Sequence, residues 1–132
     1  MIDTQTYAAR QETTRAHLDE AGIDLLVAYA DVWRPGSVFY LTNWREAAGG
    51  ISQAWCVFLL PRRGKSMLLV GFEMVLPAEQ IAVTDRVERS DRLAAALADV
   101  QRELSPRRVG LVGENILPLS VYRQLETGLA QA

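Results

Sequence analysis

The chain offers few residues that could carry out chemistry, and carboxylates are the first to consider. Asp24 opens an apolar stretch, and Asp31, Glu73 and Asp85 follow it along the chain. An aspartate on the first strand of a sheet helps to hold two magnesium ions in nucleases of the ribonuclease H type. Asp24, however, lies just after a predicted helix end, where a side chain that caps a turn is expected. We therefore interpret Asp24 as a turn residue.

The sequence contains one histidine, His17, and one cysteine, Cys56. A general base or a metal ligand needs convergent partners, and a lone histidine on a helix rarely has them. A single cysteine can form neither an intrachain disulfide nor a thiolate cluster for a metal. We expect His17 to be a solvated surface residue, which leaves few ways to build a catalytic site from this chain alone.

Two glycine-containing stretches resemble phosphate-binding loops only in part. The tripeptide GKS at positions 64–66 lacks the glycine expected five residues earlier, where Leu59 stands, and a strand is predicted after it. Gly110 and Gly113 follow a predicted strand, but their spacing does not fit a dinucleotide fingerprint and Glu114 stands where a phosphate would approach. We interpret the first stretch as a hairpin turn and the second as a strand-to-loop transition.

The segment SVFYLTNWREAAGG, residues 37–50, places aromatic side chains beside an arginine and ends in two glycines. Exposed tryptophan and arginine are the residue types that dominate binding hot spots. We predict that residues 38–41 pack under the sheet and that residues 43–46 face outward as a recognition edge. The alternative is a core-anchoring turn with Trp44 as its lid.

Composition limits the possible partners. The chain has 132 residues, of which 49% are hydrophobic, and 14 basic against 16 acidic residues give a net charge of −2. The basic residues are scattered, so we do not expect the chain to bind nucleic acid. The longest apolar run, residues 54–61, is far shorter than the ~20 residues that cross a membrane. We expect one soluble, cytoplasmic domain spanning residues 1–132.

The helices and strands that must position these residues can be predicted from the spacing of apolar residues and from the glycine, proline and capping residues between them. A weakly amphipathic helix from Tyr7 to Gly22 precedes a buried strand, and Ser90 offers an N-cap to a later helix. The last helix, opened by Pro118, is predicted to turn Tyr122 inward together with three aliphatic residues. The predicted strands cover residues 23–30, 53–60, 66–70, 85–89 and 108–113, and the predicted helices cover 7–21, 90–104 and the stretch after 118, with 73–82 ambiguous. This order predicts an α/β fold with three layers, α/β/α, and a mixed sheet of about five strands with parallel pairs and one antiparallel hairpin.

The order of elements and two short motifs resemble the N-terminal domain of the creatinase/aminopeptidase P/prolidase family. That domain has a ribonuclease H-like motif, a helix with an arginine near its start, Gly-Ile-Asp before an apolar strand, and a segment Asn-Ile/Val-x-Tyr-Leu-Thr-Gly-Phe/Tyr. The matching positions are Gly22, Ile23, Asp24, Val38, Tyr40, Leu41 and Thr42. Ser37, Asn43 and Trp44 depart from the usual asparagine, glycine and phenylalanine or tyrosine. The resemblance covers nearly the whole chain.

The resemblance implies a protein with two domains, of which this chain is the first. In the family, a downstream catalytic domain of the pita-bread fold holds two divalent metal ions, such as Mn, Co or Zn. Its ligands are two aspartates, a histidine and two glutamates. The present sequence ends before any of them, so the resemblance implies a domain without metal or cofactor of its own, whose first partner is that catalytic domain.

The resemblance also implies a homodimer in which the loop after the second motif reaches the active site of the neighbouring subunit. Trp44 and Arg45, together with Asn43 and Glu46, are then candidates to contact a peptide or small amide substrate at the domain interface. The implied function is a non-catalytic substrate-access and dimerisation domain of a metal-dependent Xaa-Pro aminopeptidase or dipeptidase-like hydrolase. The alternatives are a creatinase-like amidinohydrolase or lyase, and a stand-alone interaction module.

Overall fold

A mixed five-stranded sheet forms the middle of the protein. The computed structural model describes residues 3–46 and 55–129, and the strand order is β4-β3-β2-β1-β5. The strands are β1 (Leu25–Asp31), β2 (Trp55–Pro61), β3 (Met67–Val70), β4 (Arg86–Arg89) and β5 (Val109–Val112). β1 pairs with β5 and β3 with β4 in parallel, whereas β2 is antiparallel to both β1 and β3. The predicted hairpin is therefore present, and the β1–β2 pair adds an antiparallel ladder that the sequence did not indicate.

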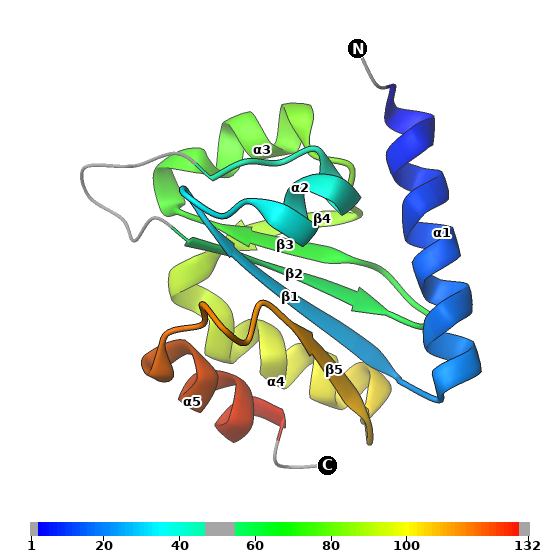
Figure 1. Cartoon of the computed structure of the whole chain (residues 1–132). Coiled ribbons are helices and arrows are strands. Elements are labelled where there is room, and N and C mark those ends of the chain that lie inside the picture. The colour runs from blue at the N-terminus through cyan, green and yellow to red at the C-terminus, as the bar shows by residue number, and fades with distance from the viewer. Residues whose placement is uncertain (1–2, 47–54, 130–132) are drawn as a thin grey trace.

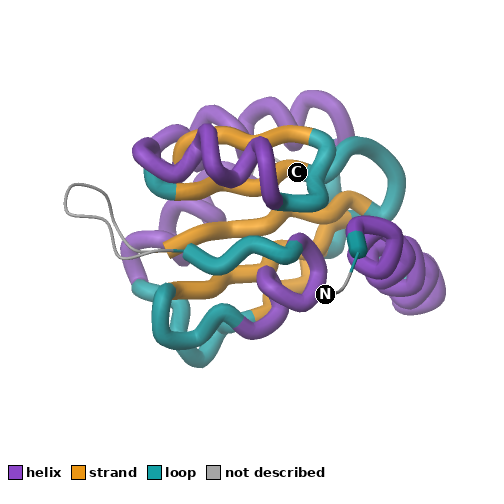
Figure 2. Tube along the Cα trace, turned by 90° about the horizontal axis from the view of Figure 1, so that it is seen from above, coloured by secondary structure: helices purple, strands orange, loops and turns teal. Residues whose placement is uncertain are grey.

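Helices cover both faces of this sheet, so the three predicted layers are confirmed (Figures 1 and 2). The helices are α1 (Thr4–Ala21), α2 (Gly36–Thr42), α3 (Val75–Ile81), α4 (Leu93–Leu104) and α5 (Leu119–Leu129), with 3-10 turns at Phe72–Met74 and Ser90–Arg92. α4 and α5 pack on one face, while α1, α2 and α3 cover the other. Within residues 3–46 and 55–129, no helix combines the length and the apolar character that crossing a bilayer requires.

The two-residue period of the central strands separates the core into two clusters. All seven residues of β1 and all seven of β2 are buried, because both strands have neighbours on both edges and helices on both faces. In β1, Leu25 and Val27 face the α4–α5 side, whereas Leu26 and Ala28 face the side of α1 and α2. The uninterrupted apolar run in the sequence reflects this double burial.

Local signals in the sequence account for both ends of α1. The side chain of Asp3 accepts a hydrogen bond from the backbone N–H of Thr6 at 3.0 Å, as an N-cap does. Gly22 ends the helix in the left-handed conformation, with φ at 69°, as the sequence predicts. The amide of Gln11 fastens the helix to the rest of the domain, since it donates to the carbonyl oxygens of Leu41 and Val83 at 2.9 and 2.7 Å.

Three sequence-based expectations about α4, β5 and α5 are wrong. Ser90 does not cap α4, because it begins a 3-10 turn and the helix starts only at Leu93. β5 was expected to be buried, yet it is an edge strand whose residues are exposed or half-buried. Tyr122 was expected to point inward, but it is 43% exposed beside that edge, which no other strand within residues 3–46 and 55–129 covers.

Candidate functional site

The segment of residues 43–46 begins where α2 ends, in a conformation that its first residue is suited to adopt. Asn43 has a left-handed backbone with φ at 66°, and its N–H donates to the carbonyl of Phe39. Its side-chain oxygen accepts a hydrogen bond from the hydroxyl of Tyr7 at 3.0 Å. Asparagine tolerates this conformation better than other residues with a side chain, which explains how it can stand where the family pattern has glycine. The chain direction after α2 is therefore fixed.

Trp44 does not face outward as predicted, because its side chain is 5% exposed and belongs to the core cluster on the α1–α2 side of the sheet. Its backbone N–H donates to the hydroxyl of Thr42, and its indole N–H donates to Glu46 Oε2 at 3.0 Å. The burial follows from α2: the tight turn at Asn43 directs the next residue back over the sheet. The alternative interpretation, in which Trp44 closes the core, is the correct one for its position.

Glu46 is also buried, contrary to the expected outward position, with an exposed fraction of 5%. Burial raises the pKa of Glu46 to about 7, because a carboxylate loses hydration there, and the nearby carboxylate of Glu73 adds to the rise. Hydrogen bonds from the Trp44 indole and the backbone of Gly71 partly oppose this increase. Glu46 thus links the segment to the turn after β3 through a carboxyl group whose pKa is about 7.

Arg45 is the one residue of the segment that faces solvent. Its guanidinium carbon lies 5.1 Å from the centre of the Phe39 ring, a cation–π contact. Within residues 3–46 and 55–129, its donors take part in no hydrogen bond or ion pair. The two neighbours of Arg45 are both buried, so the backbone of this exposed arginine is held in place on both sides.

The motif residues before this segment are mostly structural. Val38, Leu41 and Thr42 are buried, as three neighbours on one face of α2. Tyr40 was expected to pack under the sheet, but it is 54% exposed because it lies on the opposite face of the same helix. The guanidinium of Arg10 stacks on its ring at 4.1 Å and donates to its carbonyl oxygen, which joins α1 to α2.

A second exposed group at the same end of the sheet was not predicted from the sequence. β1 ends at Asp31, whose carboxylate accepts hydrogen bonds from the backbone N–H groups of Trp33 and Arg34. The same carboxylate forms an ion pair with the Arg34 guanidinium at 3.0 Å. Trp33 is 78% exposed, and its side chain lies just beyond the strand. The Trp-Arg dipeptide at positions 33 and 34 was the available signal in the sequence.

The residues first considered for chemistry have structural roles. The Asp24 carboxylate accepts hydrogen bonds from the backbone N–H groups of Arg107 and Arg108. These bonds lower the pKa of Asp24, and the positive charge of Arg62 lowers it further.

His17 is exposed, and its Nδ1 lies 3.8 Å from Glu20 Oε2. Burial raises the pKa of the Cys56 thiol, so it stays protonated and unreactive. Among the described residues, no three metal-binding side chains gather closely enough to hold an ion.

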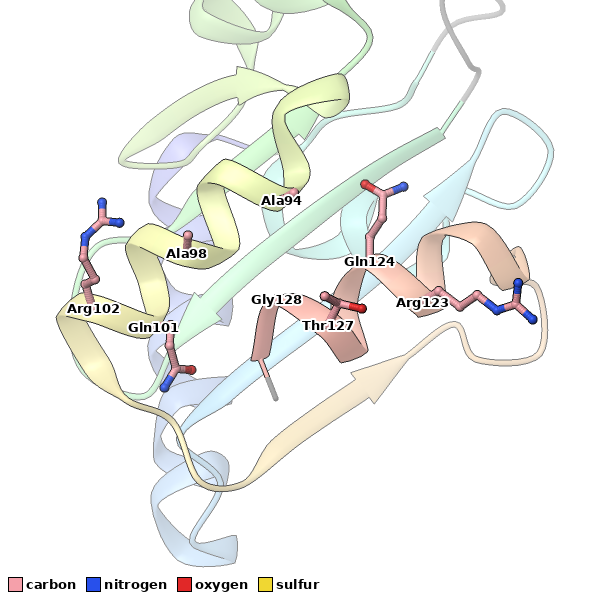
Figure 3. Close-up of a pocket in the computed structure, with 8 residues that line it drawn as sticks. All are labelled: Ala94, Ala98, Gln101, Arg102, Arg123, Gln124, Thr127 and Gly128. Carbon is pink, nitrogen blue, oxygen red and sulfur yellow. The ribbon is translucent and has the colours of Figure 1, made fainter. Parts of the chain in front are cut away.

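A groove of the described structure lies elsewhere, between α4 and α5 (Figure 3). It measures about 630 Å³, and Ala94, Ala98 and Gly128 form much of its wall. Figure 3 shows Arg102 and Arg123 extending in different directions, so that no pair of charged groups converges in it. The groove therefore lacks the geometry for acid–base or metal chemistry, and it lies on the face of the sheet opposite the segment of residues 43–46.

A family model matches most of the chain. The model of the Creatinase/Prolidase N-terminal domain matches residues 10–132. A search of curated proteins finds no match.

Solved structures with the same fold are similar over nearly the whole chain. The creatinase/prolidase N-terminal domain of an X-Pro dipeptidase from Streptococcus pyogenes has a TM-score of 0.72 at 17% identity, over 92% of this chain and 94% of that one. An Xaa-Pro dipeptidase from Bacillus anthracis has a TM-score of 0.68 at 21% identity, over 93% of this chain and 31% of that one. An X-Pro aminopeptidase from Thermotoga maritima has a TM-score of 0.68 at 18% identity, with coverage of 91% and 31%.

Proposed function

Since this chain belongs to the family of creatinase/prolidase N-terminal domains, we propose that it is the substrate-access domain of a metal-dependent Xaa-Pro hydrolase. The proposed hydrolase works as a homodimer, and the segment of residues 43–46 of one subunit lies beside the catalytic centre of the other. The described residues contain no cluster of metal ligands. The metal ions, which would activate water for hydrolysis, are therefore assigned to the catalytic domain that such a protein carries.

The observation that carries this proposal is the contrast between Arg45 and its neighbours. Trp44 and Glu46 are both 5% exposed and hydrogen-bonded to each other, while the Arg45 guanidinium is exposed and hydrogen-bonds to none of the residues 3–46 and 55–129. A rigid backbone that presents an exposed guanidinium is suited to recognise a group outside the domain, because little backbone order must be gained on binding. Asn43, Trp44 and Glu46 are then positioning residues for Arg45.

The chemistry of a guanidinium indicates which part of the substrate it contacts. Arginine binds carboxylates with two parallel N–H···O bonds, a geometry that lysine cannot reproduce. A dipeptide that ends in proline carries a carboxylate near the bond to be cleaved. We therefore assign the substrate carboxylate to Arg45. A creatinase-like substrate also carries a carboxylate, so the same role for Arg45 fits the amidinohydrolase alternative.

The test measures hydrolysis of an Xaa-Pro dipeptide with manganese, both for the 132-residue chain and for the hydrolase that contains it. The chain alone is expected to be inactive. In the hydrolase, Arg45→Ala is expected to raise KM about tenfold or more, the loss of a charge-assisted pair, with an unchanged melting temperature. Arg45→Lys should recover only part of this, and Arg102→Ala, on the other face, should behave as wild type. Turnover by the 132-residue chain, or a KM indifferent to Arg45→Ala, refutes the proposal.

A further inference from the structure

Basic residues that are far apart in the sequence meet at one end of the sheet. The connection from β2 to β3, residues 62–65, and the connection from α4 to β5, residues 105–108, together hold five of the 14 basic residues of the chain. Neither connection contains an acidic residue. Both lie where β1, β3 and β5 begin, the end of the sheet opposite to the turn after β3 that Glu46 contacts (Figure 1).

Asp24 holds these two connections side by side. Its Oδ2 accepts hydrogen bonds from the backbone N–H groups of Arg107 and Arg108 at 2.9 and 3.1 Å. Its Oδ1 accepts one from the Arg62 guanidinium at 3.0 Å, and its carbonyl oxygen accepts one from the Arg62 N–H at 2.9 Å. The two backbone bonds lower the pKa of Asp24, so its carboxylate stays ionised. Both carboxylate oxygens are thus occupied in fixing the backbone of the two connections.

A pocket of about 250 Å³ opens between the two connections. The turn from β2 to β3 packs on the end of α4 beside it, since a Cβ on Gly64 would lie 3.6 Å from Cδ2 of Leu104. Three guanidinium groups and one carboxylate line the pocket, which leaves two positive charges in excess. The lining residues are Asp24, Arg62, Arg63, Leu104, Ser105 and Arg107.

Two of the three guanidinium groups can bind a ligand without breaking the bonds that hold the connections. The side chain of Arg63 is 86% exposed, and its ion pair with Asp19 spans 3.9 Å. Such an exposed pair contributes little stability, so a ligand can replace it. The Arg107 guanidinium forms no hydrogen bond or ion pair with any residue in 3–46 or 55–129. Arg62 keeps its bond to Asp24 and adds positive charge behind them.

We propose that this pocket binds a phosphoryl group, which accepts hydrogen bonds from the guanidinium groups of Arg63 and Arg107. Arginine matches phosphate oxygens with two parallel N–H···O bonds. A phosphoryl group carries a charge of about −1.5 to −2 at pH 7, which balances the excess positive charge of the pocket. A single carboxylate carries half that charge and meets the same repulsion from Asp24.

The pocket recognises the phosphoryl group itself rather than a nucleotide base. Binding of a base usually needs an aromatic side chain on which the base stacks. Among the described residues that line the pocket, none is aromatic. Inorganic phosphate and pyrophosphate are therefore suitable probes. The site is separate from the hydrolase proposal, because it lies at the other end of the sheet from residues 43–46 and its test needs neither substrate nor catalytic domain.

The test follows the backbone amide signals of the isotope-labelled 132-residue chain by NMR while phosphate is added at constant ionic strength and a pH of about 7.5. Signals of residues 62–65 and 105–108 should shift and then saturate, with a Kd of about 1 mM for phosphate and about tenfold lower for pyrophosphate. Acetate, with a single charge, should bind about tenfold more weakly than phosphate. Glycerol 3-phosphate distinguishes two sources of the group: a Kd equal to that of phosphate supports a phosphorylated molecule, and a weaker one supports the free ion.

Variants test the two arginines against a matched control. Arg63→Ala and Arg107→Ala should each raise the phosphate Kd about tenfold, whereas Arg107→Lys should raise it less, because the charge stays and the fork is lost. Arg123→Ala removes an arginine that is equally exposed but lies on α5, and it should leave the Kd unchanged. Circular dichroism and melting temperature check that each variant is folded.

Three results overturn the proposal. The first is a set of shifts that grow in proportion to phosphate without saturating, which indicates only general screening of surface charge. The second is an Arg107→Ala variant that binds phosphate as tightly as the Arg123→Ala control. The third is an acetate Kd equal to that of phosphate, which would assign the pocket to carboxylates.

Discussion

The buried carboxyl group of Glu46 makes a prediction about the pH dependence of stability. Its pKa is raised from 4.5 to about 7 in the folded protein. Between these values the folded state holds a proton that the unfolded state has released, so the free energy of unfolding falls as pH rises from about 4.5 to about 7. Below this window the group has no effect on stability, and above it the destabilisation is complete and constant.

The magnitude follows from the size of this pKa rise. The full difference corresponds to about 3 kcal/mol of unfolding free energy, and screening by water that reaches the carboxylate reduces the expected effect to about 2 kcal/mol. Glu46→Gln replaces the carboxyl group by a neutral group of the same shape, which can still accept the hydrogen bond from the Trp44 indole. We expect this variant and the wild type to be equally stable near pH 4.5, and the variant to be the more stable one at pH 8.

The assay is urea unfolding of both proteins at several pH values from about 4.5 to 8, with Glu79→Gln on the exposed side of α3 as the matched control. The quantity to follow is the difference in unfolding free energy between variant and wild type. For Glu46→Gln it should increase with pH, whereas for Glu79→Gln it should stay constant. A difference for Glu46→Gln that is the same at both ends of the pH range would refute the reasoning, because the carboxyl group would then titrate as it does in water.

Two further predictions concern packing. Trp44→Ala should lower the free energy of unfolding by about 3–5 kcal/mol, as for other large core side chains. The control Trp33→Ala, at a 78% exposed position, should leave the melting temperature almost unchanged. Equal melting temperatures for the two variants would place Trp44 outside the core. Gly128→Ala should destabilise by about 1–3 kcal/mol in chemical denaturation, since its Cβ would lie 2.8 Å from Cβ of Leu97, and a stable variant would show that α4 and α5 can separate at no cost.

The central strands and the end of α1 could be predicted because each depends on a local signal. The continuous apolar run of β1 indicates burial on both faces, and Gly22 supplies the left-handed conformation that ends a helix. The position of β5 was not predictable in this way. Its four residues are as apolar as those of a central strand, and only the pairing of the whole sheet shows that it lies at an edge.

The candidate site was predicted in part, and the errors have one cause. The segment around Tyr40 was interpreted as a turn, whereas it is the short helix α2. With a helical period, Val38 and Leu41 fall on the inner face and Tyr40 on the outer one, as the structure has them. The seven residues of α2 are too few for that period to stand out in the sequence. The burial of Trp44 and Glu46 also depends on this helix, because the left-handed residue Asn43 at its end sets the direction of the chain that follows.

The hydrogen bonds of Asp24 affect the alignment of β5 with β1 as well as the turn before β1. A strand that is poorly covered on its faces has little burial to fix its alignment with its neighbour, and a shift by one residue would exchange its two faces. Two successive backbone N–H groups just before β5 bind the carboxylate of Asp24, which lies just before β1. The alignment of the last strand is thus determined by a side chain more than eighty residues earlier in the chain. The identity of residue 24 decides which side chains the outermost strand offers to solvent.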